Sequence, residues 1–82
     1  MIVKFESPTC GPCRKLQAFL DKEGLTVEHI NAPENMELVK KYNVSTLPTL
    51  IKVTGTLDDG KEEARLAGLV PPSKIIEFFK GE

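Results

Sequence analysis

Two cysteines stand three positions apart in this chain, Cys10 and Cys13, with Gly11 and Pro12 between them. Side chains at i and i+3 in a first helical turn lie about 5–6 Å apart, and a disulfide joins Cα atoms about 4.4–6.8 Å apart. The pair can therefore form and break a disulfide with little backbone movement. A Cys10 thiolate would face the free N–H groups and positive dipole end of the helix, which lower the pKa of a thiol. The spacing predicts thiol–disulfide exchange, with Cys10 as nucleophile and the more shielded Cys13 as resolving thiol.

Other roles for the two thiols fit the sequence less well. A structural disulfide that closes so small a ring constrains the unfolded chain only slightly. A zinc site needs four ligands, and His29 is the only other strong candidate, so one subunit cannot complete a Cys/His site. A metal or iron–sulfur cluster shared between subunits stays open as an alternative. We expect no metal, and no cofactor besides the redox-active disulfide Cys10–Cys13.

Composition limits the class of protein. A length of 82 residues, 40% hydrophobic and 28% charged, predicts one small globular domain over residues 1–82. The net charge of −1 argues against binding to nucleic acid or to a membrane surface, since both usually need a basic excess. No apolar run reaches the roughly 20 residues of a membrane helix, and the first strand leaves no room for a signal peptide. We expect a soluble, monomeric, cytoplasmic protein, in which a lasting structural disulfide would be unusual.

Hydrophobic spacing predicts the elements that hold the cysteines. Residues 1–6 have the apolar, β-branched character of a strand, and residues 7–9 break it. A helical pattern then runs from the cysteines to Gly24, a good C-terminal stop. Residues 25–30 alternate between apolar and polar, as a half-covered strand does. This βαβ unit predicts two parallel neighbouring strands, with the cysteines at the C-terminal end of the first.

The second half of the chain predicts a short helix, a hairpin and a last helix. A start signal at residues 31–33 and an apolar stripe before Asn43 indicate the short helix. Residues 49–54 and 61–67 form strands of an antiparallel hairpin, and Ser73 is expected to cap the last helix. The order β-α-β-α-β-β-α predicts an α/β fold with a four-stranded mixed sheet flanked by three helices.

Two motifs in this order resemble the thioredoxin family. Cys-Gly-Pro-Cys at residues 10–13 is identical to the family's active-site motif, and residues 41–49 resemble the segment that ends in its cis-proline. The resemblance covers essentially the whole chain and implies a thioredoxin-like fold. It also implies a cis Pro48 packed against the disulfide, with the backbone of Leu47 paired to an extended substrate segment. The residues that it places along the substrate groove are Thr9, Gly11, Pro12, Thr46, Leu47, Pro48, Gly68 and Leu69.

The chain departs from the family pattern in several places. The first strand and helix of full-length thioredoxins are missing, and Thr9 stands where a Trp usually precedes the first cysteine. Lys4 replaces the buried carboxylate six positions before that cysteine. We expect Lys4 to extend to solvent, the alternative being an amine that favours thiolate. His29 occupies a position where thioredoxins commonly carry a Lys; we expect a surface histidine, with proton transfer as the alternative.

The resemblance implies a protein-disulfide reductase, a dithiol electron carrier that a flavoenzyme of the thioredoxin-reductase type re-reduces. Glutathione-dependent reduction, as in glutaredoxins, is an alternative that the short length and Thr46-Leu47-Pro48 support. The Gly-Pro between the cysteines, and Gly68-Leu69 in place of a Gly-Gly pair, count against it. A second alternative is a thioredoxin-fold binding subunit that does not use its thiols.

Overall fold

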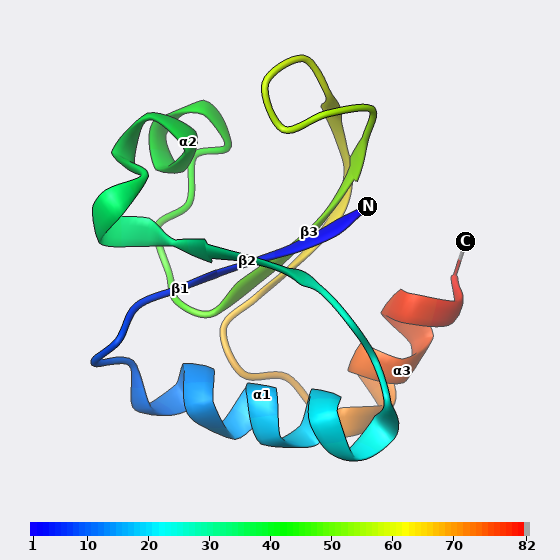
Figure 1. Ribbon diagram of the computed structural model, residues 1–82. Coiled ribbons are helices and arrows are strands. Elements are labelled where there is room, and N and C mark those ends of the chain that lie inside the picture. The colour runs from blue at the N-terminus through cyan, green and yellow to red at the C-terminus, as the bar shows by residue number, and fades with distance from the viewer. Residues whose placement is uncertain (82) are drawn as a thin grey trace.

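The computed structural model describes residues 1–81 as one sheet with helices on both faces (Figure 1). Its element order agrees with the predicted order, and the third and fourth strands have the predicted bounds. The elements are β1 (Ile2–Glu6), α1 (Gly11–Glu23), β2 (Glu28–Asn31), the 3₁₀ helix η1 (Ala32–Glu34), α2 (Met36–Lys41), β3 (Thr49–Thr54), β4 (Lys61–Ala67) and α3 (Pro72–Lys80).

The sheet has the strand order β2-β1-β3-β4, which places β1 in its interior. β1 pairs in parallel with β2, and the other two pairings are antiparallel, so the predicted mixed sheet is confirmed. Phe5 lies opposite Thr49, and Thr49 lies opposite Ala67. The C-terminal ends of β1 and β4 and the N-terminal end of β3 therefore meet at one end of the sheet.

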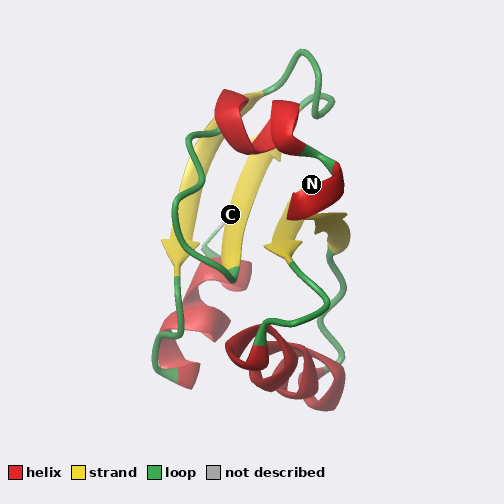
Figure 2. Ribbon diagram, turned by 90° about the vertical axis from the view of Figure 1, so that its left-hand side faces the viewer, coloured by secondary structure: helices red, strands yellow, loops and turns green. Residues whose placement is uncertain are grey.

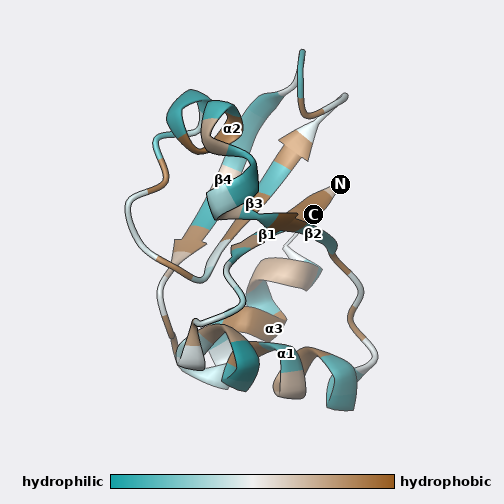
Figure 3. Cartoon of the chain, turned by 60° about the vertical axis from the view of Figure 1, so that its left-hand side comes forward, coloured by the Kyte–Doolittle hydropathy of each residue, from teal (hydrophilic) through white to brown (hydrophobic). Residues whose placement is uncertain are grey.

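Alternation along the strands divides the core between the two faces, because successive side chains of a strand point to opposite sides. Val3 and Phe5 of β1 face α2, whereas Ile2 and Lys4 face α1 and α3 (Figures 1 and 2). The central strands carry hydrophobic segments, and the outer turns of the helices are hydrophilic (Figure 3). The core on the α2 side consists of Val3, Phe5, Ile30, Tyr42, Ile51 and Val53, and that on the other side of Leu16, Leu20, Leu50, Ile75 and Phe78.

Three local predictions about element boundaries are wrong. The second strand begins at Glu28, because the chain after Gly24 first closes the end of α1 with a bond from the Leu25 N–H to the Leu20 carbonyl. The predicted short helix is split by the non-helical backbone of Asn35 (φ −135°, ψ 50°). Ser73 does not cap α3: the cap is Pro71, without a side-chain bond, and the helix begins at Pro72, a position that proline tolerates well.

The end of α2 is joined to β4 by one arginine. Arg65 donates from its guanidinium to the backbone carbonyls of Tyr42 and Asn43, where the chain turns in the left-handed conformation (Asn43 φ 51°). Glu62 holds the guanidinium with both carboxylate oxygens, at 2.5 and 2.6 Å. These bonds lower the pKa of Glu62, despite the opposing effect of burial. Helix α2 and the segment that follows it are thereby fixed to the outer strand.

Candidate active site

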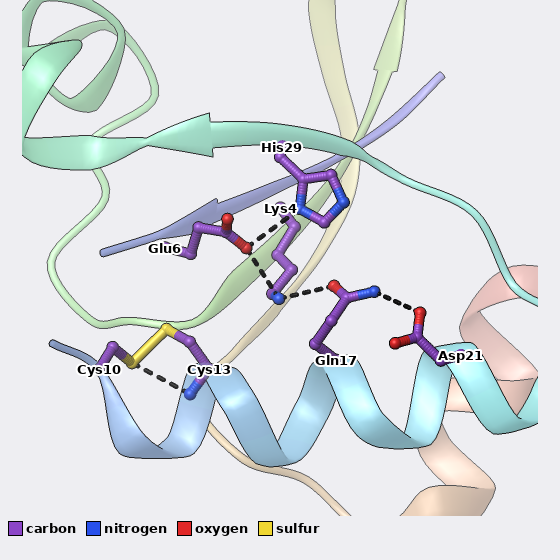
Figure 4. A network of polar contacts seen from close by, with 7 residues as sticks. All are labelled: Lys4, Glu6, Cys10, Cys13, Gln17, Asp21 and His29. Carbon is purple, nitrogen blue, oxygen red and sulfur yellow. Dashed lines mark hydrogen bonds and ion pairs between the residues drawn. A yellow bond between two sulfur atoms is a disulfide. The ribbon is translucent and has the colours of Figure 1, made fainter. Parts of the chain in front are cut away.

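The cysteines lie where β1 leads into α1, and they form a disulfide with their Cα atoms 5.2 Å apart (Figure 4). A turn after β1, closed by the Cys10 N–H bond to the Ser7 carbonyl, delivers Cys10 to the N-cap of the helix. Pro12 stands in the first turn, where it has no needed N–H to lose. The Cys13 backbone N–H donates to Cys10 Sγ at 3.1 Å. A helix amide thus points at the Cys10 sulfur, as the sequence predicts.

The two sulfur-bearing residues differ in access. Cys13 is 3% exposed and packs beneath the first turn, whereas Cys10 is half-buried. Gly11 and Pro12, between them, are exposed. Cys10 is therefore the more accessible of the two cysteines from outside the molecule.

Three loops that are distant in the sequence lie at the end of the sheet where β1 ends and β3 begins, the end at which β1 leads toward the disulfide. Thr9 is exposed on the first of them, and Thr46 on the second. The second also carries Leu47, half-buried, and the buried Pro48; their peptide bond is cis, as the resemblance implied. In the third, the Gly68 N–H donates to the Pro48 carbonyl at 2.7 Å. The structure thus brings the predicted groove residues around Pro48 together with those around Gly68.

Gly68 and Leu69 differ in what they contribute to this surface. Gly68 has φ +75°, a backbone conformation that glycine adopts without strain. A Cβ there would lie 3.6 Å from Thr46 Cγ2, an ordinary contact, so the backbone conformation, not lack of space, explains the glycine. The Leu69 side chain is 52% exposed. It provides apolar surface next to the glycine.

An apolar pocket that the sequence analysis did not identify continues from this surface toward α2. Thr46 and Leu47 form one wall, and η1, α2 and the following loop form the rest. Its other apolar lining residues are Ala32, Pro33, Met36, Val39 and Val44. Met36 is 51% exposed at its rim.

Lys4 does not extend to solvent, and that prediction is wrong. The side chain is only 2% exposed, between β1 and α1 (Figure 4). Its ammonium lies 2.8 Å from Glu6 Oε1 and donates to Gln17 Oε1 at 2.8 Å. The Gln17 amide in turn donates to Asp21 Oδ1. Helix α1 covers the stem of Lys4, and the two oxygens supply the partners that a buried ammonium needs.

His29 lies on the surface of β2, as expected, but it also joins this network. It stands opposite Lys4 in the parallel pairing and is 51% exposed. Its Nδ1 lies 3.2 Å from Glu6 Oε1. Burial acts to raise the pKa of Glu6, but hydrogen bonds and charge from Lys4 and His29 outweigh it, and the pKa lies below its ordinary value of 4.5.

Glu6 is the residue of this site that the sequence analysis missed. The signal was present, because residues two apart on a strand share a face, so Glu6 must lie on the same side as Lys4. The same network borders the disulfide: Lys4, Glu6, Gln17 and His29 line a small pocket together with Cys13. A buried cation thus shares a cavity with the shielded thiol.

Residues 1–81 contain neither a cluster of potential metal ligands nor a membrane-spanning helix. Within that range, no group of three or more His, Cys, Asp or Glu side chains is placed to hold a metal ion. None of the helices in the same range is both long and apolar enough to cross a membrane.

The family model for thioredoxin matches residues 1–81. The chain belongs to the thioredoxin family. It is 38% identical over 74 residues to a thioredoxin of Chlamydia pneumoniae, covering 84% of this chain and 69% of that one. It is 33% identical over 84 residues to a thioredoxin of Rhodospirillum rubrum, covering 95% and 77%. The resemblance stated from the two motifs is therefore confirmed.

Solved thioredoxin structures share the fold. Fasciola hepatica thioredoxin aligns with a TM-score of 0.72 at 28% identity, over 98% of this chain and 77% of that one. Drosophila melanogaster Deadhead aligns with a TM-score of 0.79 at 20% identity, over the same shares. Together with the close Cys10–Cys13 pair, the family makes this chain a thiol–disulfide oxidoreductase whose substrates are protein disulfides.

Proposed function

We propose that the protein reduces disulfides of other proteins, with Cys10 as the attacking thiolate and Cys13 as the resolving thiol. The observation that carries this assignment is the asymmetry of the pair. Cys10 is accessible and its sulfur accepts a helix N–H, whereas Cys13 is buried. A hydrogen bond and a helix N-terminus both stabilise a thiolate, which is the reactive form of cysteine.

The reaction proceeds in two exchanges. The Cys10 thiolate attacks one substrate sulfur, a bond forms between the two proteins, and the other substrate sulfur leaves as a thiolate that takes up a proton. Cys13 then loses its proton and attacks Cys10 Sγ. This closes the Cys10–Cys13 disulfide and releases the second substrate thiol, so the substrate gains the electron pair that the protein loses.

The surface beside the disulfide supports binding of an extended substrate segment. Of the residues that we assign to it, Thr9, Pro12, Thr46 and Leu69 are exposed and Leu47 is half-buried, so they are available to a substrate. The backbone of Leu47 would pair with the substrate as an added strand does. The apolar pocket under Thr46 and Leu47 would take a neighbouring apolar side chain of the substrate.

A flavoenzyme of the thioredoxin-reductase type is the reductant that fits this chain. The Gly68-Leu69 sequence lacks the Gly-Gly pair expected for glutathione binding, and Gly-Pro stands between the cysteines. We place the protein in the cytoplasm as a single-domain monomer over residues 1–82, without metal. Its only redox group is the disulfide Cys10–Cys13, and the net charge of −1 gives no basis for binding nucleic acid or a membrane.

Single-cysteine variants test the assignment. Cys13→Ser should accumulate a mixed disulfide with an oxidised model protein such as insulin, and Cys10→Ser should not; insulin reduction should fall to background in both. Accumulation in Cys10→Ser instead would reverse the roles, and activity that survives replacement of both cysteines would leave only a binding role. Comparing NADPH plus thioredoxin reductase with NADPH plus glutathione and its reductase identifies the reductant.

A further inference from the structure

The buried ammonium beside Cys13 is the feature that the proposed function does not yet use. We propose that Lys4, held by Glu6 and Gln17, stabilises the thiolate of Cys13 during the resolving step and so promotes release of the substrate. This inference rests on the proposed function, because it assumes that Cys13 is the resolving thiol. Lys4 acts in it as a cation fixed near the reacting sulfur, and Glu6 and Gln17 as positioning residues.

The geometry places the ammonium close to Cys13 by two separate observations. Cys13 and Gln17 are one helical turn apart on α1, so their side chains leave the same face. Lys4 Nζ is 2.8 Å from Gln17 Oε1 and therefore lies under that face (Figure 4). Lys4 and Cys13 also line the same pocket. In Figure 4 the ammonium lies between the sheet and the helix, with the disulfide on one side and Asp21 on the other.

The ammonium is fixed rather than mobile. It is buried with its stem, and within residues 1–81 it contacts one carboxylate oxygen and one amide oxygen. A lysine ammonium has three donors, so a further donor remains for an acceptor in the pocket that Cys13 lines. A thiolate formed at Cys13 is such an acceptor.

The charges around the pocket favour a thiolate at Cys13. Lys4 and Glu6 come from β1, His29 from β2, and Arg14 from α1. Asp21 lies further along α1 and is bound to Gln17. Burial alone disfavours a thiolate, and Cys13 is 3% exposed, so a nearby cation is what this thiol needs. An opposite charge within about 4–6 Å changes the pKa of an acid by about 1–3.

Glu6 is poorly suited to take the Cys13 proton itself. Burial would raise its pKa, but the bonds and charges from Lys4 and His29 bring the pKa below its ordinary value, which makes the carboxylate a weak base. In the proposed step the Cys13 S–H bond breaks and its proton passes to water, since half-exposed His29 lines the same pocket. The Cys13 sulfur then bonds to Cys10 Sγ, and the bond from Cys10 to the substrate breaks. The released substrate thiolate takes up a proton from water.

The test uses the fact that the chain has only two cysteines. In a Cys10→Ala variant, Cys13 is the only thiol. Its ionisation can be followed by the ultraviolet absorbance of the thiolate as the pH is raised. Adding Lys4→Met removes the charge but keeps the stem. We expect the fraction of Cys13 thiolate at neutral pH to fall about tenfold, the equivalent of one pKa unit. Lys4→Arg should restore most of it.

Two further variants keep the result interpretable. Lys40→Met removes an exposed lysine from α2, on the opposite face of the sheet, and should leave the titration unchanged. Glu6→Gln removes the anion next to Lys4 and should shift the titration in the opposite direction, so that Cys13 ionises at lower pH. That variant still decides the matter if Lys4→Met does not fold.

Kinetics in the protein with both cysteines separate this inference from the proposed function. Lys4→Met should slow release of the trapped substrate at neutral pH, and alkaline pH should restore the rate. If Cys13 titrates identically with and without Lys4 in folded variants, and Glu6→Gln also leaves it unchanged, the role of Lys4 is overturned. The Cys13→Ser trapping experiment would still hold in that case, whereas failure of the trapping would remove the proposed function itself.

Discussion

The two faces of the sheet are built from the same strands but bury different kinds of side chain. The face under α2 buries a largely apolar set of side chains, together with the hydroxyls of Tyr42 and Thr49, which both donate to backbone carbonyls. The face under α1 and α3 contains a comparable set of apolar residues, but two lysines, Lys4 and Lys52, are buried with them. Among the described residues, the first face therefore buries no charged side chain, whereas the second also has to accommodate charge.

The two buried lysines differ in where they meet a helix. Lys52 donates to the Phe78 carbonyl at 2.9 Å and the Gly81 carbonyl at 3.5 Å, at the C-terminal end of α3. A helix C-terminus favours a cation, so Lys52 has a structural explanation. Lys4 meets α1 at Gln17, in the middle of the helix, where neither terminus acts on a cation, and Glu6 supplies the opposing charge instead. Lys4 therefore lacks the helix-terminus explanation that accounts for Lys52.

The largest effect should come from the apolar face. Phe5→Ala removes a fully buried ring and should reduce the free energy of unfolding by about 3–5 kcal/mol, as measured by denaturant titration. Phe19→Ala is the matched control, because Phe19 is only half-buried against the other face, and its loss should be smaller. Equal losses would show that the two faces do not differ in packing as described.

Exchanging each buried lysine for methionine should separate structure from chemistry. Lys52→Met leaves the carbonyls at the end of α3 without this donor and should cost about 1–3 kcal/mol of unfolding free energy, with unchanged disulfide-exchange rates. Lys4→Met should instead change the pH dependence of disulfide exchange. If Lys52→Met slowed disulfide exchange as much as Lys4→Met does, the two lysines would not differ in their effect on the thiols, and the distinction between them would be wrong.

A smaller effect is expected from the Tyr42 hydroxyl, on the face under α2. Tyr42 donates to the Leu57 carbonyl at 2.6 Å, and burial together with Asp58 and Glu62 raises the pKa of its hydroxyl, so it remains a donor at neutral pH. Lys41 also donates to that carbonyl, which therefore keeps a partner in Tyr42→Phe. The loss should be about 0.5–1 kcal/mol, read from the denaturation midpoint. A loss as large as that of Phe5→Ala would mean that the hydroxyl organises this face.

The smallest effect should appear only in acid. The pKa of Glu6 is lowered in the folded protein, so its contribution to stability is present above the ordinary value of 4.5 and is lost as the pH falls through the lower, folded value. Glu6→Gln should therefore lose less stability between pH 7 and pH 3 than the unaltered protein does. Glu62, whose pKa is also lowered, will preserve part of the acid sensitivity. An unchanged pH profile in Glu6→Gln would contradict the role of its ion pair.

Local patterns were sufficient to predict most of the fold and the reactive pair. Two strand-like segments separated by a turn predict β3 and β4, and the break after β1 places the cysteines at the start of α1, where their spacing alone allows a disulfide. Errors arose where several local signals compete. After Gly24, closing the end of α1 delays the next strand, and at α3 a proline in the first turn leaves no need for Ser73 as a cap.

The network around Lys4 could be predicted only in part. Strand alternation places Lys4 and Glu6 on one face, but whether a lysine reaches solvent depends on how closely the next helix covers it. That is a property of packing between distant segments. Gln17 gives the ammonium its second partner because helix α1 crosses β1 at this position, and no local spacing encodes the crossing.

Arg65 connects the segment that leads to Thr46 and Leu47 with strand β4. Its guanidinium holds the end of α2 against β4, so the chain leading to Thr46 and Leu47 is attached to the outer strand. The two cysteines, in contrast, belong to the N-terminus of α1. The segment with Thr46 and Leu47 and the segment with the two cysteines are therefore held by different parts of the fold. Under the proposed function, substitutions near Arg65 should therefore alter substrate preference more than they alter the reduction potential of the thiols, so that selectivity and redox strength could diverge.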